Sequence, residues 1–268
     1  MILIIILLVL AILYTLALRG RVGYKETEKF TNVRYAHRGL HKKNGYPENS
    51  LAAFKAAVDK GYGIELDIHL LADGNLAVIH DSSLLRTTGV EKEIEQLKTE
   101  ELSDYYLEDT KEKIPTLKEV LKLVNGRVPL LIECKIKKNT SQLCSALISQ
   151  TADYKGDFCV ESFDPRCVLW FKRHTPKIVR GQLAEDFIKD KNTGVSFITR
   201  ILLTALLFNF LNKPDFIAHR FEDRKNLANI ICLRFWKMKG FSWTIKSEEI
   251  LNIAEKEKLS PIFENIEP

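Results

Sequence analysis

Apolar and amphipathic stretches alternate along the chain from residue 33 to its end. Nine short apolar runs have the length of buried strands, and they cover residues 33–37, 64–70, 76–80, 130–135, 158–163, 177–181, 215–219, 241–245 and 261–264. Helical periodicity separates most of them, at residues 50–60, 117–124, 141–151, 165–174, 225–238 and 247–256. Strands that alternate with helices predict a parallel sheet, and about eight such repeats predict an α/β fold of the (β/α)8 TIM-barrel type.

A barrel of this type has eight strands, so one of the nine runs does not belong to it. The residues of one turn indicate which run this is. Asp73-Gly74 lies between the runs at residues 64–70 and 76–80, and so short a turn joins antiparallel strands. We therefore expect residues 76–80 to be a hairpin arm and the other eight runs to form the barrel.

The N-terminus is apolar without interruption. Residues 2–18 contain no charged side chain, and a helix of this length rises about 25 Å, at the short end of what spans a bilayer. No Lys or Arg precedes the run, so the basic region of a cleaved signal peptide is missing. We predict a single transmembrane helix over residues 1–18, a juxtamembrane linker over residues 19–32 and a catalytic domain over residues 33–268.

Basic residues follow this apolar terminus, at Arg19, Arg21, Lys25 and Lys29. By the positive-inside rule such a flank stays on the cytoplasmic side, so we predict a single-pass membrane protein with a cytoplasmic domain. A buried core helix and a signal that exports the domain remain alternatives.

A second apolar run covers residues 195–211, where Arg200 and Asn209 are the main interruptions. A buried outer helix of the barrel fits this composition, and so does a helix that presses an apolar face into the membrane interface. A second transmembrane span would break the barrel, so we do not expect one.

The composition excludes some classes of partner and site but does not indicate a function. The formal net charge of +5 is compatible with an anionic membrane surface or substrate, but it is too small to predict a nucleic-acid partner. The five cysteines are an odd number and contain no CxxC pair, which argues against a disulfide framework or a zinc site. We expect them to be buried free thiols.

Side chains that carry chemistry follow the predicted strand ends, which is where TIM barrels place their active sites. They are His37-Arg38, Glu65, Asp67, His80-Asp81, Glu133, Lys135, Ser162-Phe163 and Trp243. Glu65 and Asp67 are two residues apart on one strand, so both carboxylates point to the same face and repel unless a cation lies between them. An arginine for an anion and two histidines of near-neutral pKa complete a set suited to metal-assisted phosphoryl chemistry.

The order and spacing of these motifs resemble the glycerophosphodiester phosphodiesterase family, in its membrane-anchored bacterial type. The resemblance covers roughly residues 33–268. It rests on HRG at residues 37–39, PENS at 47–50, ExD at 65–67, HD at 80–81, RTTG at 86–89, IPTLKEV at 114–120, IECK at 132–135, SFD at 162–164 and WT at 243–244. The family's PENT is PENS here, and its closing Gly-Asp-Gly motif is degenerate in SPIFENIEP.

The resemblance implies a hydrolase of phospholipid and glycerol metabolism that converts glycerophosphodiesters to glycerol 3-phosphate and an alcohol. It also implies a divalent cation, Ca²⁺ or Mg²⁺, as cofactor. By motif match the metal ligands are Glu65, Asp67 and Glu133. The same match makes His37 and His80 the acid/base pair. Arg38 and Lys135 would hold the phosphate.

The remaining motif residues are predicted to contact or support the substrate. Glu48 is expected to brace the loop of His37 and Arg38 rather than to react. Ser162 and Phe163 are expected to line the pocket, whereas Trp243 packs against glycerol or only against the barrel. We expect structural roles for the other histidines, with the last one the least certain because it ends a strand: His41, His69, His174 and His219.

Two rival functions remain open. A lysophospholipase D would take a lipid that still bears one acyl chain, and the two apolar runs favour it because both would put the site beside lipid. A non-catalytic barrel that binds glycerophosphate groups is the second rival, and the complete set of candidate catalytic and metal-binding residues argues against it. The residues leave open whether water or the glycerol 2-hydroxyl is the nucleophile.

Overall fold

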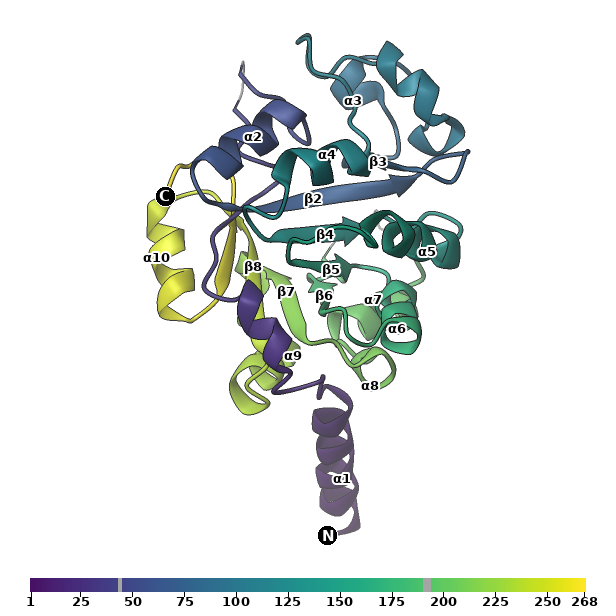
Figure 1. The fold of residues 1–268 in the computed structure, drawn as a ribbon. Coiled ribbons are helices and arrows are strands. Elements are labelled where there is room, and N and C mark those ends of the chain that lie inside the picture. Colours follow the sequence, from purple (N-terminus) through teal and green to yellow (C-terminus); the bar gives the residue numbers. More distant parts are fainter. Residues whose placement is uncertain (43–44, 190–193) are drawn as a thin grey trace.

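The computed structural model describes residues 1–42, 45–189 and 194–268. Within these residues eight parallel strands form a closed barrel, because the first strand pairs with both the second and the last. The predicted TIM barrel is therefore confirmed (Figure 1). The parallel strands are β1 (Tyr35–Ala36), β2 (Gly63–Leu70), β4 (Leu130–Cys134), β5 (Phe158–Ser162), β6 (Arg180–Ala184), β7 (Phe216–Arg220), β8 (Lys239–Ile245) and β9 (Ser260–Phe263).

The extra strand, β3 (Leu76–Val78), is the predicted hairpin arm. It runs antiparallel to β2, with Leu76 opposite Leu70. β6 begins three residues later than expected, because the observed strand contains the polar side chains of Arg180 and Gln182 and continues to Ala184, beyond the run at residues 177–181. Both of these side chains are buried, and they donate hydrogen bonds to carbonyl oxygens of neighbouring segments.

Helices cover the outside of the barrel (Figure 1). They are α2 (Leu51–Asp59), α3 (Leu85–Thr88), α4 (Leu117–Val124), α5 (Thr140–Thr151), α6 (Pro165–His174), α7 (Phe197–Thr204), α8 (Asn209–Asn212), α9 (Leu227–Ile230) and α10 (Glu248–Lys256). The single helix expected over residues 225–238 is divided, because α9 continues as a π-helical turn, η5 (Ile231–Phe235). Short 3-10 turns complete the set at η1 (Lys25–Phe30), η2 (Ile94–Gln96), η3 (Thr99–Asp104) and η4 (Phe221–Asp223).

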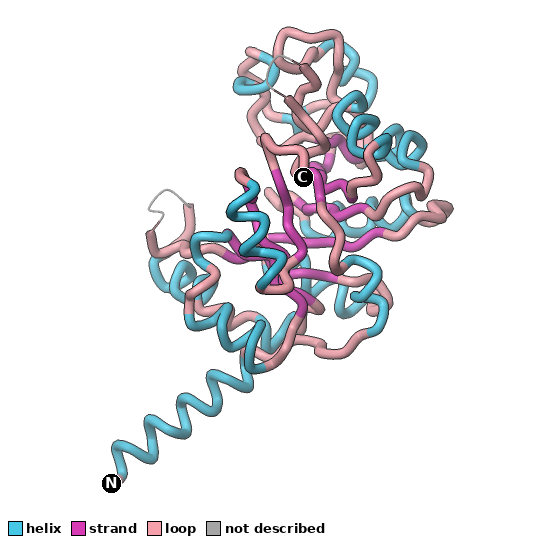
Figure 2. The backbone as a smooth tube through the Cα atoms, turned by 90° about the vertical axis from the view of Figure 1, so that its left-hand side faces the viewer, coloured by secondary structure: helices cyan, strands magenta, loops and turns pink. Residues whose placement is uncertain are grey.

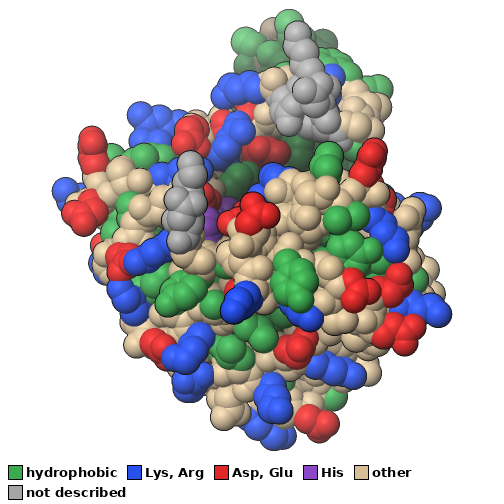
Figure 3. Space-filling model, turned by 90° about the horizontal axis from the view of Figure 1, so that it is seen from above, with side chains coloured by type: hydrophobic (Ala, Val, Ile, Leu, Met, Phe, Trp, Pro, Cys, Tyr) green, Lys and Arg blue, Asp and Glu red, His purple; other side chains and the backbone are tan. Residues whose placement is uncertain are grey.

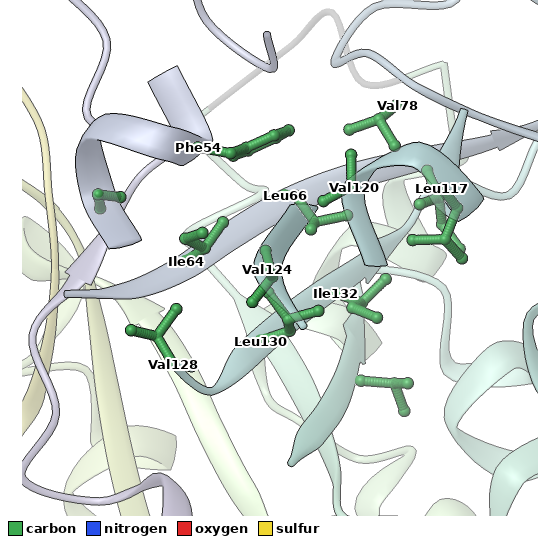
Figure 4. Packing of buried hydrophobic residues seen from close by; sticks show 14 of the residues in the cluster. Phe54, Ile64, Leu66, Val78, Leu117, Val120, Val124, Val128, Leu130 and Ile132 are labelled. Atoms are coloured by element: carbon green, nitrogen blue, oxygen red, sulfur yellow. The ribbon is translucent and has the colours of Figure 1, made fainter. Parts of the chain in front are cut away.

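Alternation along the strands divides the core into two parts. On β2, Ile64 and Leu66 point outward and pack with Phe54 of α2 and Val120 of α4, as Figure 4 shows. The residue between them, Glu65, therefore faces the barrel interior. The same alternation puts the acidic residues of neighbouring strands inside the barrel and its aliphatic residues under the helices.

Aromatic side chains fill the barrel interior at the N-terminal end of the strands. Tyr35, Phe216 and Phe241 are fully buried there, and the Phe241 ring centroid lies 5.7 Å from that of Tyr35 and 4.3 Å from that of Phe216. Phe30 of η1 joins the same cluster. The barrel is thus closed at this end, and its polar interior lies toward the opposite end.

The N-terminal helix α1 (Ile2–Ala17) projects away from the barrel, as Figures 1 and 2 show. It has 16 residues, none of them buried. The predicted transmembrane helix over residues 1–18 is not found, because no helix among the described residues is long and apolar enough to cross a membrane. A span needs about 20 residues.

The predicted linker packs on the barrel rather than hanging free. The Arg21 guanidinium Nη2 donates to Asp215 Oδ2 at 2.7 Å, and Arg19 lies over the Trp236 ring. Trp236 in turn donates to the Thr15 carbonyl of α1 at 2.7 Å. These contacts fix the base of α1.

The second apolar run, residues 195–211, forms two short helices rather than one. α7 buries none of its residues, so it is not the buried outer helix that one alternative required. Phe197 and Ile198 are 57% and 70% exposed, respectively. In α8, by contrast, Asn209 and Asn212 are buried.

We predict that Ile132→Ala lowers the free energy of unfolding by about 2–5 kcal/mol, because Ile132 is fully buried between the sheet and the helices. Chemical denaturation followed by circular dichroism measures this change. Ile198→Ala is the matched control and should change it by no more than about 0.5 kcal/mol. Equal losses in the two variants would contradict this account of the core.

Candidate active site

Strands β2 and β4 bring three carboxylates together inside the barrel. Asp67 lies in register with Glu133, and Glu65 precedes Asp67 on the same face of β2. All three residues are buried, and one ligand oxygen from each lies within 4.8 Å of the others. The three acids predicted as metal ligands therefore form one cluster that could hold a metal ion.

Two cations and an amide contact this cluster. Lys135 Nζ lies 3.0 Å from Asp67 Oδ1 and 2.8 Å from Glu133 Oε1. The Arg38 Nε lies 3.6 Å from Asp67 Oδ2, to which the Asn49 amide donates at 2.9 Å. Burial opposes ionisation of Asp67, but the charges of these neighbours hold its pKa well below the ordinary value.

The two glutamates of the cluster behave in the opposite way. Burial, together with the charges of Asp67 and Glu133, raises the pKa of Glu65 well above its ordinary value. Burial also raises the pKa of Glu133, although Lys135 opposes this change. The cluster holds more carboxylate than Arg38 and Lys135 neutralise, and carboxylate oxygens are the ligands that Ca²⁺ and Mg²⁺ prefer. The donor set thus fits a divalent cation.

His37 and His80, the predicted acid/base pair, each have a carboxylate on Nδ1. His37 Nδ1 lies 2.8 Å from Glu264 Oε2, and His80 Nδ1 lies 2.6 Å from Asp81 Oδ1. His37 Nε2 lies 3.9 Å from Glu65 Oε2, next to the acidic cluster. A carboxylate on Nδ1 fixes the tautomer of the ring and leaves Nε2 for a reacting group.

Both imidazoles have a pKa below the ordinary value for histidine. Burial lowers the pKa of His37, although the hydrogen bond with Glu264 opposes this change. Burial also lowers the pKa of His80, to about 4. The hydrogen bond with His37 in turn lowers the pKa of Glu264 to about 2. A neutral imidazole can accept a proton, and the carboxylate behind it stabilises the imidazolium that forms.

Glu48 supports the loop after β1. It accepts hydrogen bonds from Arg38 Nη1 at 3.0 Å and from Arg86 Nη2 at 2.6 Å. The Arg38 backbone N–H donates to Glu65 Oε2 at 2.9 Å, which ties the same loop to the acidic cluster. Glu48 thus has the geometry of a bracing residue that orients Arg38.

A cavity of about 100 Å³ opens among these groups. One wall is charged, and the other is apolar. On the face shown in Figure 3, acidic and basic side chains are interspersed around a hollow in which a histidine is visible. The cavity is lined by His37, Arg38, Glu65, His80, Glu133, Lys135, Glu161, Phe163, Leu183, Trp243, Thr244 and Ile262.

The predicted substrate-contacting residues divide into two groups. Phe163 and Trp243 line the cavity and meet edge to face, with ring centroids 5.7 Å apart. Ser162 does not line it, because its hydroxyl donates to the Cys134 carbonyl at 2.7 Å. His219, whose role was left open, is fully buried outside the cavity and bonds through Nδ1 to the Arg220 carbonyl.

Two site residues were missed by the sequence analysis, Glu161 and Glu264. Period-2 alternation on β5 places Glu161 on the same face as Phe163, which was a usable signal. Glu264 lies directly after β9, where a strand-end acid could have been considered beside His37. Glu264 lies within the degenerate closing motif, which indicated no role for it.

Similarity to known proteins identifies the family of this chain. The model of the glycerophosphoryl diester phosphodiesterase family matches residues 37–199, which is more than half of the chain. The chain belongs to this family. The match contains the acidic cluster, both histidines and the cations Arg38 and Lys135 of the cavity.

Relatives with curated names agree with the family. A glycerophosphodiester phosphodiesterase of Bacillus altitudinis is 42% identical over 112 residues, which are 39% of this chain and 45% of that protein. The putative glycerophosphodiester phosphodiesterase YhdW of Bacillus subtilis is 36% identical over 228 residues, 80% of this chain and 86% of the relative. A lysophospholipase D of Rattus norvegicus is 34% identical over 140 residues, 47% of this chain and 44% of the relative. The match to the first of these thus spans less than half of that relative's length.

Solved structures agree on the fold. A glycerophosphodiester phosphodiesterase from Thermotoga maritima superposes with a TM-score of 0.67 at 26% identity, covering 86% of this chain and 93% of the other. A phosphodiesterase from Oleispira antarctica, solved with the product sn-glycerol-3-phosphate, gives a TM-score of 0.70 at 21% identity over 91% and 95% of the chains. The barrel of this family is therefore shared across nearly the whole length.

We predict that the chain binds Ca²⁺ or Mg²⁺ and that Asp67→Asn weakens the binding roughly tenfold or more, because affinity follows the number of charged oxygen ligands. Isothermal titration calorimetry with each metal measures this effect without any substrate. Asp104→Asn changes an exposed acid outside the cavity and is the control. Unchanged affinity in Asp67→Asn would remove this residue from the metal site.

Proposed function

We propose that this chain is a metal-dependent glycerophosphodiester phosphodiesterase that hydrolyses glycerophosphodiesters to glycerol 3-phosphate and an alcohol, as a step of phospholipid and glycerol metabolism. The observation that carries this proposal is the meeting of the acidic cluster with two carboxylate-paired histidines in one cavity. Membership of the family and the names of the relatives support it.

The cations of the cavity would hold the phosphate. A phosphodiester carries one negative charge, which repels a nucleophile until it is neutralised. A divalent cation held by Glu65, Asp67 and Glu133 would supply neutralising charge to the phosphate oxygens and to the transition state. Arg38 lies against this cluster with Glu48 behind it, and Lys135 bridges two of the acids, so both cations are already positioned on the phosphate side.

The histidines would move the protons. One imidazole would accept the proton of the attacking oxygen at Nε2. The other would take up a proton at Nε2 when the anionic phosphate binds beside it, and it would then donate that proton to the leaving alkoxide. The carboxylates of Glu264 and Asp81 hold the two rings through Nδ1, so the proton is exchanged at the opposite nitrogen. These steps suit water as the nucleophile and equally suit the glycerol 2-hydroxyl.

We predict that His37→Ala and His80→Ala each lower kcat on glycerophosphocholine on the order of 10²- to 10⁴-fold, since each removes one proton transfer. The assay follows release of glycerol 3-phosphate. His174→Ala removes an exposed histidine that stacks on Trp170 outside the cavity, and it serves as the control. Near-normal turnover of His80→Ala would exclude His80 from the mechanism.

A lysophospholipase D activity is the second candidate. The relative of that name and the exposed apolar side chains of α1 and α7 favour it, because an acylated substrate would need an apolar surface near the protein. Lysophosphatidylcholine added to the same assay separates the two, and excess chelator should abolish turnover of either. A non-catalytic glycerophosphate-binding barrel would turn over neither substrate.

We further propose that α1 associates with the surface of an anionic membrane, on the cytoplasmic side. Its apolar side chains are exposed along its length, and an apolar groove of about 630 Å³ separates it from η5. Such a helix gains free energy by burying its side chains in the interface. Within the basic flank Arg21 is paired with Asp215, whereas Arg19 and Lys25 are exposed and would attract anionic lipid.

We predict that the full chain sediments with phosphatidylglycerol vesicles and that the double variant Leu7→Asp, Leu10→Asp loses most of this binding, because two charges would enter the apolar interface. Leu85→Asp is the matched control, since Leu85 is as exposed as these residues but lies on α3. A wild-type chain that stays in the supernatant would contradict the proposal. Binding of the double variant equal to that of wild type would do the same.

A further inference from the structure

Glu161 is a buried acid of the cavity that the mechanism does not use. It lies on β5, opposite Glu133 on one side and Gly181 on the other. Its side chain lines the cavity and the residue is only 2% exposed. Its Oε2 atom is buried without a hydrogen-bond partner among the described residues. A buried carboxyl oxygen without a partner is costly, so it marks a place where a ligand atom would be stabilised.

The position of Glu161 argues against a place in the cation site. The oxygen atoms that cluster within 4.8 Å of one another come from β2 and β4, and Glu161 is outside this group. A phosphate oxygen has other partners in the cavity, because Arg38 and Lys135 lie with the acids of β2 and β4. Burial and Glu65 raise the pKa of Glu161. An uncharged hydroxyl group is the remaining partner, because it can form a hydrogen bond with the carboxyl group in either protonation state.

The residues around Glu161 indicate what kind of molecule would carry this hydroxyl group. Phe163, Leu183 and Ile262 form the apolar wall on the side of the cavity away from the acids. Gly181, beside Glu161, has no side chain to cover the carboxyl group, and a Cβ there would lie 2.0 Å from the Phe216 ring. A short carbon chain that bears hydroxyl groups suits this arrangement, because its carbon atoms can contact the apolar wall while a hydroxyl group reaches Glu161.

We propose that Glu161 accepts a hydrogen bond from a free hydroxyl of the substrate's glycerol unit and thereby selects glycerophosphodiesters over diesters that lack a polyol. This inference rests on the proposed function. The phosphate would lie at the charged wall, the glycerol carbons against the apolar wall, and the leaving alcohol toward the mouth of the cavity. Glu161 would then be a substrate-binding residue that sets specificity.

The test compares two ligands that share a phosphate and differ in the polyol. Titration calorimetry of the full chain, with Ca²⁺ present, gives the affinities for sn-glycerol 3-phosphate and for inorganic phosphate. We expect Glu161→Leu to reduce the ratio of these affinities roughly 10- to 100-fold, because one buried hydrogen bond is lost and the hydroxyl group of the ligand is left without a partner. Glu161→Gln keeps an acceptor oxygen and should retain most of the ratio. A wild-type chain that binds sn-glycerol 3-phosphate no more tightly than phosphate would overturn the inference.

Other outcomes also decide the matter. An unchanged ratio in Glu161→Leu would show that the residue does not contact the polyol. A parallel loss of Ca²⁺ affinity and of both ligands would assign Glu161 to the cation site instead and would also overturn the inference. If Glu161→Leu does not fold, as judged by its melting temperature, Glu161→Met replaces it, and an equal ratio in Glu161→Met and Glu161→Gln would overturn the inference. Turnover of glycerophosphocholine by the wild-type chain, measured separately, tests the proposed function and is independent of this ratio.

Discussion

The structure depends on one electrostatic constraint, the enclosure of several carboxylates inside a closed barrel. Parallel pairing sets the register of β2 against β4, and this register places Asp67 opposite Glu133 with no freedom to separate. Buried like charges repel strongly because the interior screens them poorly. Lys135 contacts both acids, and Asn49 and Arg38 contact Asp67, so the chain balances part of the repulsion with its own groups. A divalent cation would neutralise the remaining negative charge of the cluster.

The rest of the fold keeps this arrangement rigid. The aromatic layer of Tyr35, Phe216 and Phe241 closes the barrel beneath the acids and excludes water from that side. The helix layer packs on the outward face of the same strands, where Leu66 alternates with Glu65 (Figure 4). A strand that shifted by one residue would exchange these two faces, burying charge under the helices. Packing and site geometry are thus specified by the same alternation.

Much of this could be predicted from the sequence, because local patterns carry it. Apolar runs located the strands, and Asp73-Gly74 located the hairpin. The predicted bounds of β6 were wrong, because arginine is typical of the protein surface. Arg180 is buried in the structure, and only its tertiary hydrogen bonds explain this burial. Glu161 and Glu264 were missed for a related reason, because their importance comes from strands that are distant in sequence. The apolar N-terminus predicted a membrane span, but α1 has 16 residues, and the Thr15 carbonyl in its last turn accepts a hydrogen bond from Trp236, which no local pattern encodes.

The reacting phosphate and the leaving alcohol of the proposed substrate would meet different parts of the protein. The proposed reaction requires charge balance at the phosphate and imidazoles that exchange protons, and both would be supplied where the acidic cluster, His37 and His80 meet. With the glycerol unit inside the cavity, the leaving alcohol would extend through the open side of the cavity toward the surface. Head-group or acyl selection would then depend on the surface around this opening rather than on the barrel interior. A phosphodiesterase and a lysophospholipase D would then share one interior and differ only in what surrounds its opening.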